Sequence, residues 1–108
     1  MFEDFLKVDI RVGRIVDVAE FPEAKKPAYI LKVDFGSEVG VKQSSAQITK
    51  NYSKQDLLNT LVLALVSVTP RQVGPFVSEV LVLGVYDSHG GVWLINPGGP
   101  VPLGSKLC

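Results

Sequence analysis

The sequence contains almost no cysteine, and its single cysteine is Cys108. One cysteine closes no disulfide within the chain, so a reducing, cytoplasmic environment is expected. Long apolar runs are also missing. The longest run, residues 61–68, is far too short to span a bilayer, and no membrane insertion is expected. Glu3 and Asp4 interrupt the first residues with charge, so no secretory signal is expected either.

Residues that carry catalysis are scarce. The one histidine, His89, lies in DSHGG, where the glycines favour an exposed turn over a general base. A metal site needs several clustered ligands, which one histidine and one cysteine do not supply. Ser44 and Ser45 have no base nearby in the sequence, and no phosphate loop or dinucleotide fingerprint is present. The sequence therefore predicts no enzyme, no cofactor and no metal, and a hydrolase using Ser44 or His89 is disfavoured.

Net charge is zero, which argues against a general polyanion-binding protein. Its distribution is uneven, because residues 1–54 contain nine of the eleven basic and eight of the eleven acidic side chains. A small soluble domain normally covers its surface with mixed charge. The neutral second half is therefore expected to be covered or offered to a partner, and self-association is the simplest cover.

Short apolar segments between glycines and prolines favour strands in the first half. A first strand begins near residue 8, and its apolar alternation slips after Gly13, which predicts a bulge or bend there. The segment 28–36 predicts a second strand, with one apolar face formed by Tyr29, Leu31, Val33 and Phe35. A third strand is expected to begin near residue 39 and to run into the polar segment KQSSAQIT.

The second half predicts one helix and further strands. Ser53 with Asp56 three residues later resembles a capping box, so a short helix is expected at about 54–60. Two apolar strands, at 61–68 and 77–86, are expected on either side of a PRQVGPF loop. A short strand in GGVWLIN and a Pro/Gly-rich tail that lies on the domain complete the chain. This order predicts an all-β OB-fold, a five-stranded Greek-key barrel with one helix between strands 3 and 4, plus N- and C-terminal extensions, as a single domain 1–108.

Two surface patches are candidates for binding. Charge combined with hydroxyl and amide donors suits phosphate and sugar contacts, and the first patch offers Lys42, Ser44, Ser45, Gln47, Lys50 and Arg71. A solvated strand end with ordinary surface lysines explains the same spacing. The second patch is the PRQVGPF loop with Val73 and Phe76, which is either an apolar contact site for a peptide or subunit, or a plug of the barrel end. Lys25 and Lys26 are interpreted as a solvated loop pair.

Five segments, in order and over nearly the whole chain, resemble the CsaA family of export-related chaperones built on a tRNA-binding domain. They are KVDIRVG (7–13), FPEAKKPAY (21–29), KQSSAQIT (42–49), PRQVGPFVSEVLVLG (70–84) and PVPLGSKL (100–107). More distantly, the chain is similar to tRNA-binding domains attached to methionyl- and phenylalanyl-tRNA synthetases and to endothelial monocyte-activating polypeptide II.

The resemblance implies a homodimer whose terminal extensions help to form the interface. It also implies binding of unfolded or precursor polypeptides and of tRNA, with a tRNA-contacting face that includes SSAQIT and Ser78. Because phosphate neutralisation dominates tRNA affinity, the zero net charge ranks polypeptide binding first and tRNA binding second.

Overall fold

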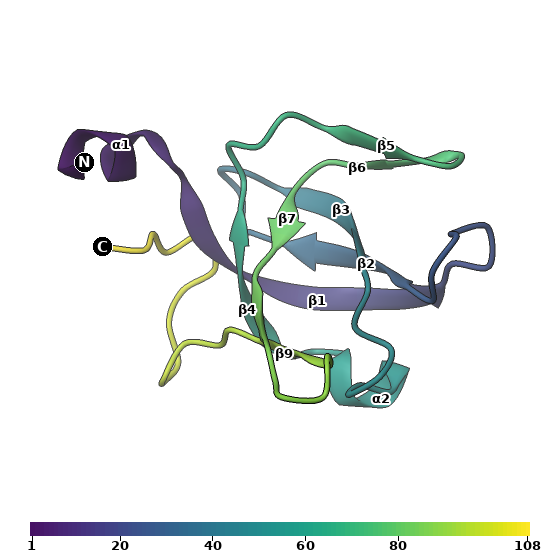
Figure 1. The fold of residues 1–108 in the computed structure, drawn as a ribbon. Coiled ribbons are helices and arrows are strands. Elements are labelled where there is room, and N and C mark those ends of the chain that lie inside the picture. Colours follow the sequence, from purple (N-terminus) through teal and green to yellow (C-terminus); the bar gives the residue numbers. More distant parts are fainter.

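A long antiparallel strand, β1, is the centre of the fold in the computed structural model, which describes residues 1–108. The main sheet has the order β3-β2-β1-β4-β7, so β3 and β7 are its two edges. Its strands are β1 (Ile10–Glu20), β2 (Tyr29–Asp34), β3 (Val41–Ala46), β4 (Leu61–Leu65) and β7 (Leu81–Val82). The sheet curls into a nearly closed barrel (Figure 1), and this confirms the predicted all-β, OB-type architecture.

The barrel interior is filled by alternate residues of the strands. In β2, Tyr29, Leu31 and Val33 are buried, and Phe35 just beyond the strand is fully buried, as the alternation predicted. Ile15 of β1 and Val62 of β4 contribute from the neighbouring strands and are also fully buried. One continuous apolar core therefore holds the sheet in its curled form.

The bulge in β1 lies at Val16 and not at the predicted Gly13. The register with β2 shifts between Ile15 and Asp17, which leaves Val16 as the extra residue. Gly13 is instead a site of close packing, because a Cβ there would overlap Val33 and lie 2.9 Å from the ring of Phe35. The slip in the apolar pattern therefore has two causes, which are close packing at Gly13 and the bulge at Val16.

The helix α2 (Lys54–Leu57) begins with the predicted capping box. The Ser53 hydroxyl accepts a bond from the Asp56 amide at 3.2 Å, and the Ser53 amide donates to the Asp56 carboxylate at 2.8 Å. These bonds hold the pKa of Asp56 below its ordinary value, with the Ser53 amide as the largest cause. The helix is shorter than predicted, because Leu58 takes an extended backbone conformation and Asn59 a positive φ of 68°, and neither continues an α-helix.

Two further hairpins lie outside the main sheet, and only one of their strands was predicted as such. They are β5 (Arg71–Val73) with β6 (Phe76–Ser78), and β8 (Gly84–Tyr86) with β9 (Val92–Leu94). PRQVGPF is thus a hairpin and not a loop, because Gly74 at positive φ and the following proline turn the chain. The single strand expected at 77–86 is divided among β6, β7 and β8, while the short strand expected in GGVWLIN is confirmed as β9.

The tail lies on the domain, as predicted, and the strand with which it pairs is β1. The amide of Val12 donates to Ser105, and the amides of Gly104 and Leu107 donate back to β1, all at 2.8 to 2.9 Å. Arg11 of β1 forms a backbone bridge with Lys106 of the tail, and it is only 6% exposed. Hydrogen bonds to Asp9 and Glu38 satisfy this guanidinium and raise the pKa of Arg11, Asp9 being the larger cause.

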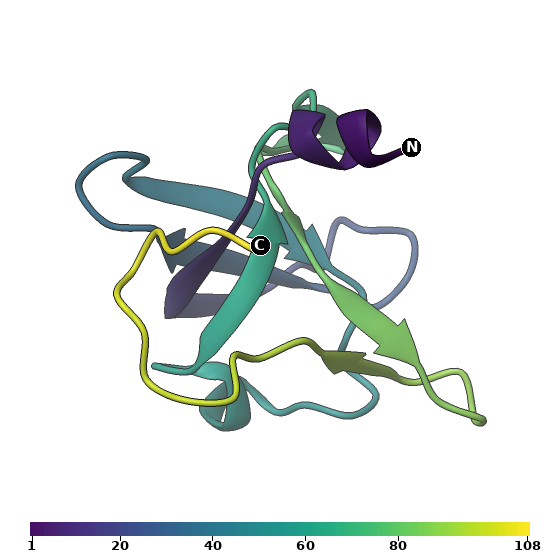
Figure 2. The same cartoon turned by 90° about the vertical axis from the view of Figure 1, so that its left-hand side faces the viewer.

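A helix that the sequence did not predict, α1 (Phe2–Lys7), precedes the barrel. None of its residues is buried. Figures 1 and 2 both show it standing away from the sheet, on the side of the molecule where the C-terminus also ends. Neither helix has the length and apolar character required to cross a membrane.

Candidate ligand-binding groove

Three adjoining cavities form a continuous hollow over the outer side of β3, and we refer to their combined surface as the Arg71 groove. Their volumes are about 130, 310 and 410 Å³, and Ser45 and Arg71 line all three. Gln47 lines the two larger cavities, and Leu81 lines the two smaller ones. Residues from β3, β5 and β7 therefore meet here, although 37 positions separate Ser45 from Val82 in the chain.

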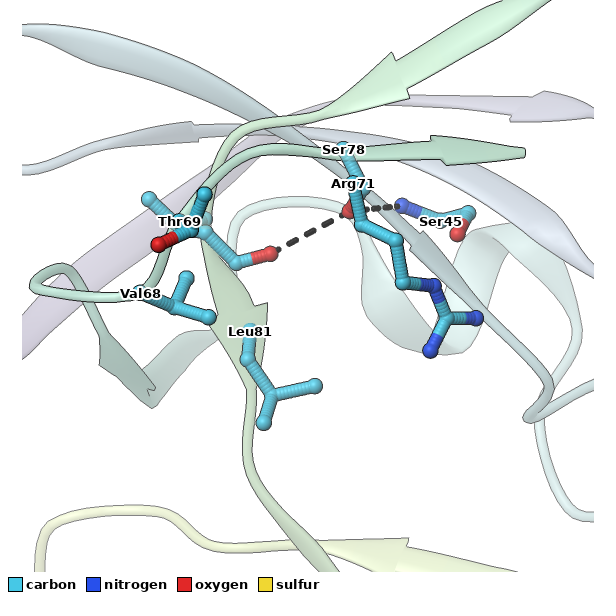
Figure 3. Close-up of a pocket in the computed structure, with 7 residues that line it drawn as sticks. Ser45, Val68, Thr69, Arg71, Ser78 and Leu81 are labelled. Atoms are coloured by element: carbon cyan, nitrogen blue, oxygen red, sulfur yellow. Dashed lines mark hydrogen bonds between the residues drawn. The ribbon is translucent and has the colours of Figure 1, made fainter.

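Arg71 is the central cation of the groove. It opens β5, its side chain is exposed, and it takes part in no salt bridge within the chain. Figure 3 shows its guanidinium extending into the space between Ser45 and Leu81. An arginine without an intramolecular partner in a hollow is available to bind an anionic group, which its planar fork accepts in a bidentate manner.

Ser78 holds the wall of the groove together. Its hydroxyl accepts a hydrogen bond from the Ser45 amide at 3.1 Å and donates one to the Val80 carbonyl at 3.2 Å, as Figure 3 shows. Gln43 adds a second link, since its side-chain amide donates to the Val77 carbonyl at 2.9 Å. These bonds fasten β6 to β3 and thereby set the position of Arg71 on the neighbouring strand.

The remaining residues predicted for tRNA contact are not all on this surface. Ser44 differs from the prediction, because it is fully buried and its hydroxyl donates to the Ser45 carbonyl. Lys42 is half-buried and lines none of the three cavities. Lys50 is exposed outside them, and its ammonium donates to the His89 carbonyl. The groove thus contains Ser45, Gln47, Arg71 and Ser78 from the predicted set.

The two residues predicted for peptide contact lie on the β5–β6 hairpin. Val73 lines the 410 Å³ cavity. Phe76 packs edge-to-face against the buried Phe21, with ring centroids 5.5 Å apart. Phe76 therefore anchors the hairpin to the loop before β2, although Phe76 itself remains partly exposed.

Lys25 and Lys26 also line the 410 Å³ cavity, together with Arg71 and Glu23. From the sequence, this lysine pair was expected in a solvated loop, apart from the other candidate residues. More than 40 residues separate the pair from Arg71, and no spacing rule joins them. Only the fold of the hairpin over the loop brings the three cations into one hollow.

The other end of the groove is held by Asp87 at the tip of the β8–β9 hairpin. Its carboxylate accepts hydrogen bonds from the amides of His89 and Gly91 at 2.9 Å, from Asn51 at 3.1 Å and from the Trp93 indole at 3.0 Å. These donors, the His89 amide first, hold the pKa of Asp87 below its ordinary value. The ionised carboxylate thus braces the hairpin whose strand β8 lines the groove.

A curled five-stranded barrel with a groove across its outer strands is a binding domain of the OB class. The family model described as a putative tRNA binding domain matches residues 10–106. The solved CsaA chaperone of Picrophilus torridus is 48% identical, with a TM-score of 0.93 over 100% of this chain and 98% of that one. The CsaA chaperone of Bacillus anthracis is 47% identical, with a TM-score of 0.94 over 100% and 97%. The chain belongs to the CsaA family of tRNA-binding-type domains.

A wider relationship extends to the methionine–tRNA ligases. The enzyme of Thermococcus onnurineus is 42% identical over 106 residues, which are 98% of this chain and 14% of the ligase. The chain therefore spans about 14% of the length of that relative.

Proposed function

We propose that this chain is a non-catalytic, cytoplasmic chaperone that binds unfolded or precursor polypeptides in the Arg71 groove. The observation that carries the proposal is the composition of the groove walls. Apolar side chains of β7 and β8, Leu81 and Val85 among them, stand opposite polar residues of β3, with an unpaired arginine between. An unfolded polypeptide offers apolar side chains and unpaired backbone groups together, so a wall of each kind suits it.

Leu81→Ser tests this proposal. Leu81 is 49% exposed and lines two of the cavities, and loss of its apolar contact is expected to weaken binding of a denatured client about fivefold, or ~1 kcal/mol. Suppression of client aggregation, titrated with chaperone, measures the effect. Leu58→Ser is the matched control, because Leu58 is 46% exposed but lies at α2 outside the groove. Equal behaviour of the two variants would contradict the proposed site.

Binding of tRNA is the second candidate function, supported by the shared cavity of Lys25, Lys26 and Arg71. These cations contact phosphates, and Ser45 and Gln47 add hydroxyl and amide groups beside them. Lys42, Ser44 and Lys50, the other predicted contacts, have no part in this version of the site. Because zero net charge gives no general attraction, affinity depends on this local cluster.

Salt titration of tRNA binding tests the second function. Lys26→Ala is expected to weaken binding and to reduce the slope of log K against log salt by about one, as the loss of one phosphate contact requires. Lys54→Ala is the control, because Lys54 lies in α2 away from the groove. Fluorescence anisotropy of labelled tRNA measures both variants. No binding at low salt would remove this function, whatever the result for polypeptides.

A homodimer completes the proposed function. Phe2 and Leu6 of α1 are 70% and 65% exposed, and a cavity of about 300 Å³ separates the end of this helix from the tail at Lys106 and Leu107. An isolated helix of six residues has little stability of its own in water. A second copy of the chain that packs on this apolar surface accounts for both features.

A further inference from the structure

We propose that the Arg71 groove binds its polypeptide as an added β-strand, paired with the open edge of β8, and that an acidic group of the bound segment contacts Arg71. This inference rests on the proposed polypeptide binding and specifies its geometry. It assigns the recognition of clients to backbone groups, with one charge contact, rather than to a sequence of side chains.

The barrel is open at the groove. β3 and β7 are the two ends of the main sheet and do not pair with each other. The 310 Å³ cavity lies between them, with residues 45–48 on one side and residues of β7 and β8 on the other. β3 and β7 themselves lie too close together to admit a strand between them, so the unfilled position lies beyond the end of β7, between residues 46–48 and β8.

The backbone of β8 presents unused hydrogen-bonding groups to that position. Bonds to the β9 side involve Asp87, which donates to Gly91 at 2.8 Å, and Leu83, which accepts from Ile95 at 3.1 Å. In an antiparallel pair, alternate residues point their N–H and C=O groups to opposite sides. The corresponding groups of Gly84 and Tyr86, between these two, point away from β9 and toward the open side.

The opposite wall also has free backbone groups. Gln47, directly after β3, makes no hydrogen bond within the chain through its amide, carbonyl or side chain. Ser45 next to it uses its amide for Ser78, and Arg71 extends into the space between Ser45 and Leu81. The 310 Å³ cavity therefore offers free backbone groups of β8 and Gln47 on its two walls, and a single cation, Arg71.

The β7–β8 edge lacks the devices that normally protect an open edge. Natural sheets block such edges with lysine, proline or inward charge, because an unguarded edge pairs with other chains. The segment 81–86, LVLGVY, contains none of these. Val85 is 57% and Tyr86 82% exposed. An apolar, uncharged edge that remains open is what a strand-accepting site requires.

A single extended polypeptide is the occupant that fits this space. A folded second copy would have to bring a whole sheet edge into a hollow of about 310 Å³ bounded by β3 and Arg71. An extended segment needs only the width of one strand, about 4.8 Å from its neighbour. RNA lacks amide donors at strand spacing. Arg71 is the only cation that lines this 310 Å³ cavity, since Lys25 and Lys26 line the adjoining 410 Å³ cavity, and one cation matches one carboxylate rather than a run of phosphates.

A peptide probe tests the proposal with the full chain. The probe is a fluorescein-labelled heptapeptide of alternating valine and threonine. It is made in two forms, with an aspartate at the N-terminal end or at the C-terminal end. Two further versions carry N-methyl groups on alternate amides, on one strand edge or on the other. We expect one methylated version to bind about tenfold more weakly and the other to match the parent, because an added strand uses one edge for pairing.

The outcomes separate this inference from the function on which it rests. If both methylated peptides bind as well as the parent, strand addition is overturned and polypeptide binding stands. If no peptide binds while the chain also fails to suppress client aggregation, both are overturned. An asparagine in place of the aspartate is expected to weaken binding about fivefold in the native chain and to have no effect in Arg71→Ala, and an equal effect in both chains would overturn the charge contact.

Tyr86→Pro tests the same edge from the side of the protein. Proline at 86 removes an amide that faces the open side and leaves the bonds between β8 and β9 in place. Tyr86→Ala is the matched control for loss of the ring, and Trp93 fluorescence verifies that the hairpin is folded in both. We expect Tyr86→Pro to bind the peptide about tenfold more weakly than Tyr86→Ala. Equal peptide affinities of the two variants would overturn the proposal. It would also be overturned if Tyr86→Pro changed the oligomeric state without changing peptide binding, or if it weakened binding of an RNA oligonucleotide instead of the peptide.

Discussion

At the scale of single residues, Gly13 illustrates how the core limits the sequence. Its backbone is ordinary extended strand, so no positive φ requires glycine there. The requirement comes from Val33 and Phe35 of the neighbouring strand and the segment after it, whose side chains occupy the space of a Cβ. Both are fully buried and have no room to withdraw.

Gly13→Ala is therefore expected to destabilise the fold by overpacking, by about 1–3 kcal/mol. Urea unfolding, followed by the fluorescence of Trp93, measures the change. Gly99→Ala is the control, because a Cβ at that position meets nothing within 4 Å and the backbone there has no positive φ. A Gly13→Ala protein as stable as the control would show that the core relaxes around the added methyl.

At the scale of elements, the β8–β9 hairpin is held by one carboxylate at its tip. Hydrogen bonds from His89, Asn51, Gly91 and Trp93 lower the pKa of Asp87 relative to an unfolded chain. The ionised form therefore stabilises the folded hairpin at every pH above the ordinary aspartate value of about 3.9. That contribution is lost as the pH falls through the lowered pKa of the folded state.

Acid titration of the Trp93 fluorescence is expected to show a hairpin transition below the ordinary pKa of aspartate. Trp93 is the only tryptophan, and its indole donates to Asp87 at 3.0 Å, so the signal reports this contact. In Asp87→Asn the transition is expected to disappear, with a loosened hairpin already at neutral pH. Asp17→Asn is the control, because Asp17 lies on β1 away from the hairpin. An unchanged transition in Asp87→Asn would assign it to another group.

At the scale of the whole molecule, α1 and the C-terminal tail lie on one side, and the Arg71 groove is formed by other elements. Phe2 and Leu6 are exposed on α1, while the groove is built from β3, the β5–β6 hairpin, β7 and β8. Self-association through α1 therefore leaves the groove free for a ligand in each copy, and the two proposals are compatible.

The double variant Phe2→Ser with Leu6→Ser is expected to shift a homodimer to monomer. Removal of two large apolar side chains from the proposed interface is expected to weaken association by about 2–4 kcal/mol, or at least thirtyfold. Sedimentation velocity over a range of concentrations measures the shift, with Leu58→Ser as the control. A native chain that sediments as a monomer at high concentration would contradict the dimer itself.

The groove shows which site residues a sequence pattern finds and which it does not. The polar segment after residue 42 was singled out by its composition, but the assignment of faces within it depended on the strand. Ser44 lies in the core and Ser45 lines the groove, since neighbouring residues of a strand point to opposite sides. Lys25 and Lys26 were assigned to solvent, because the contact that joins them to Arg71 spans more than 40 residues.

Features that depend on neighbouring residues could be predicted from the sequence alone. The alternation in β2 defines a buried face, and the pair Ser53 and Asp56 defines a helix start, because both arise from backbone geometry within a few positions. Only the tertiary structure decided where β1 bulges, how the segment 77–86 divides among three strands, and which side chains meet at Arg71. These depend on packing and hydrogen bonds between distant segments, which no local pattern encodes.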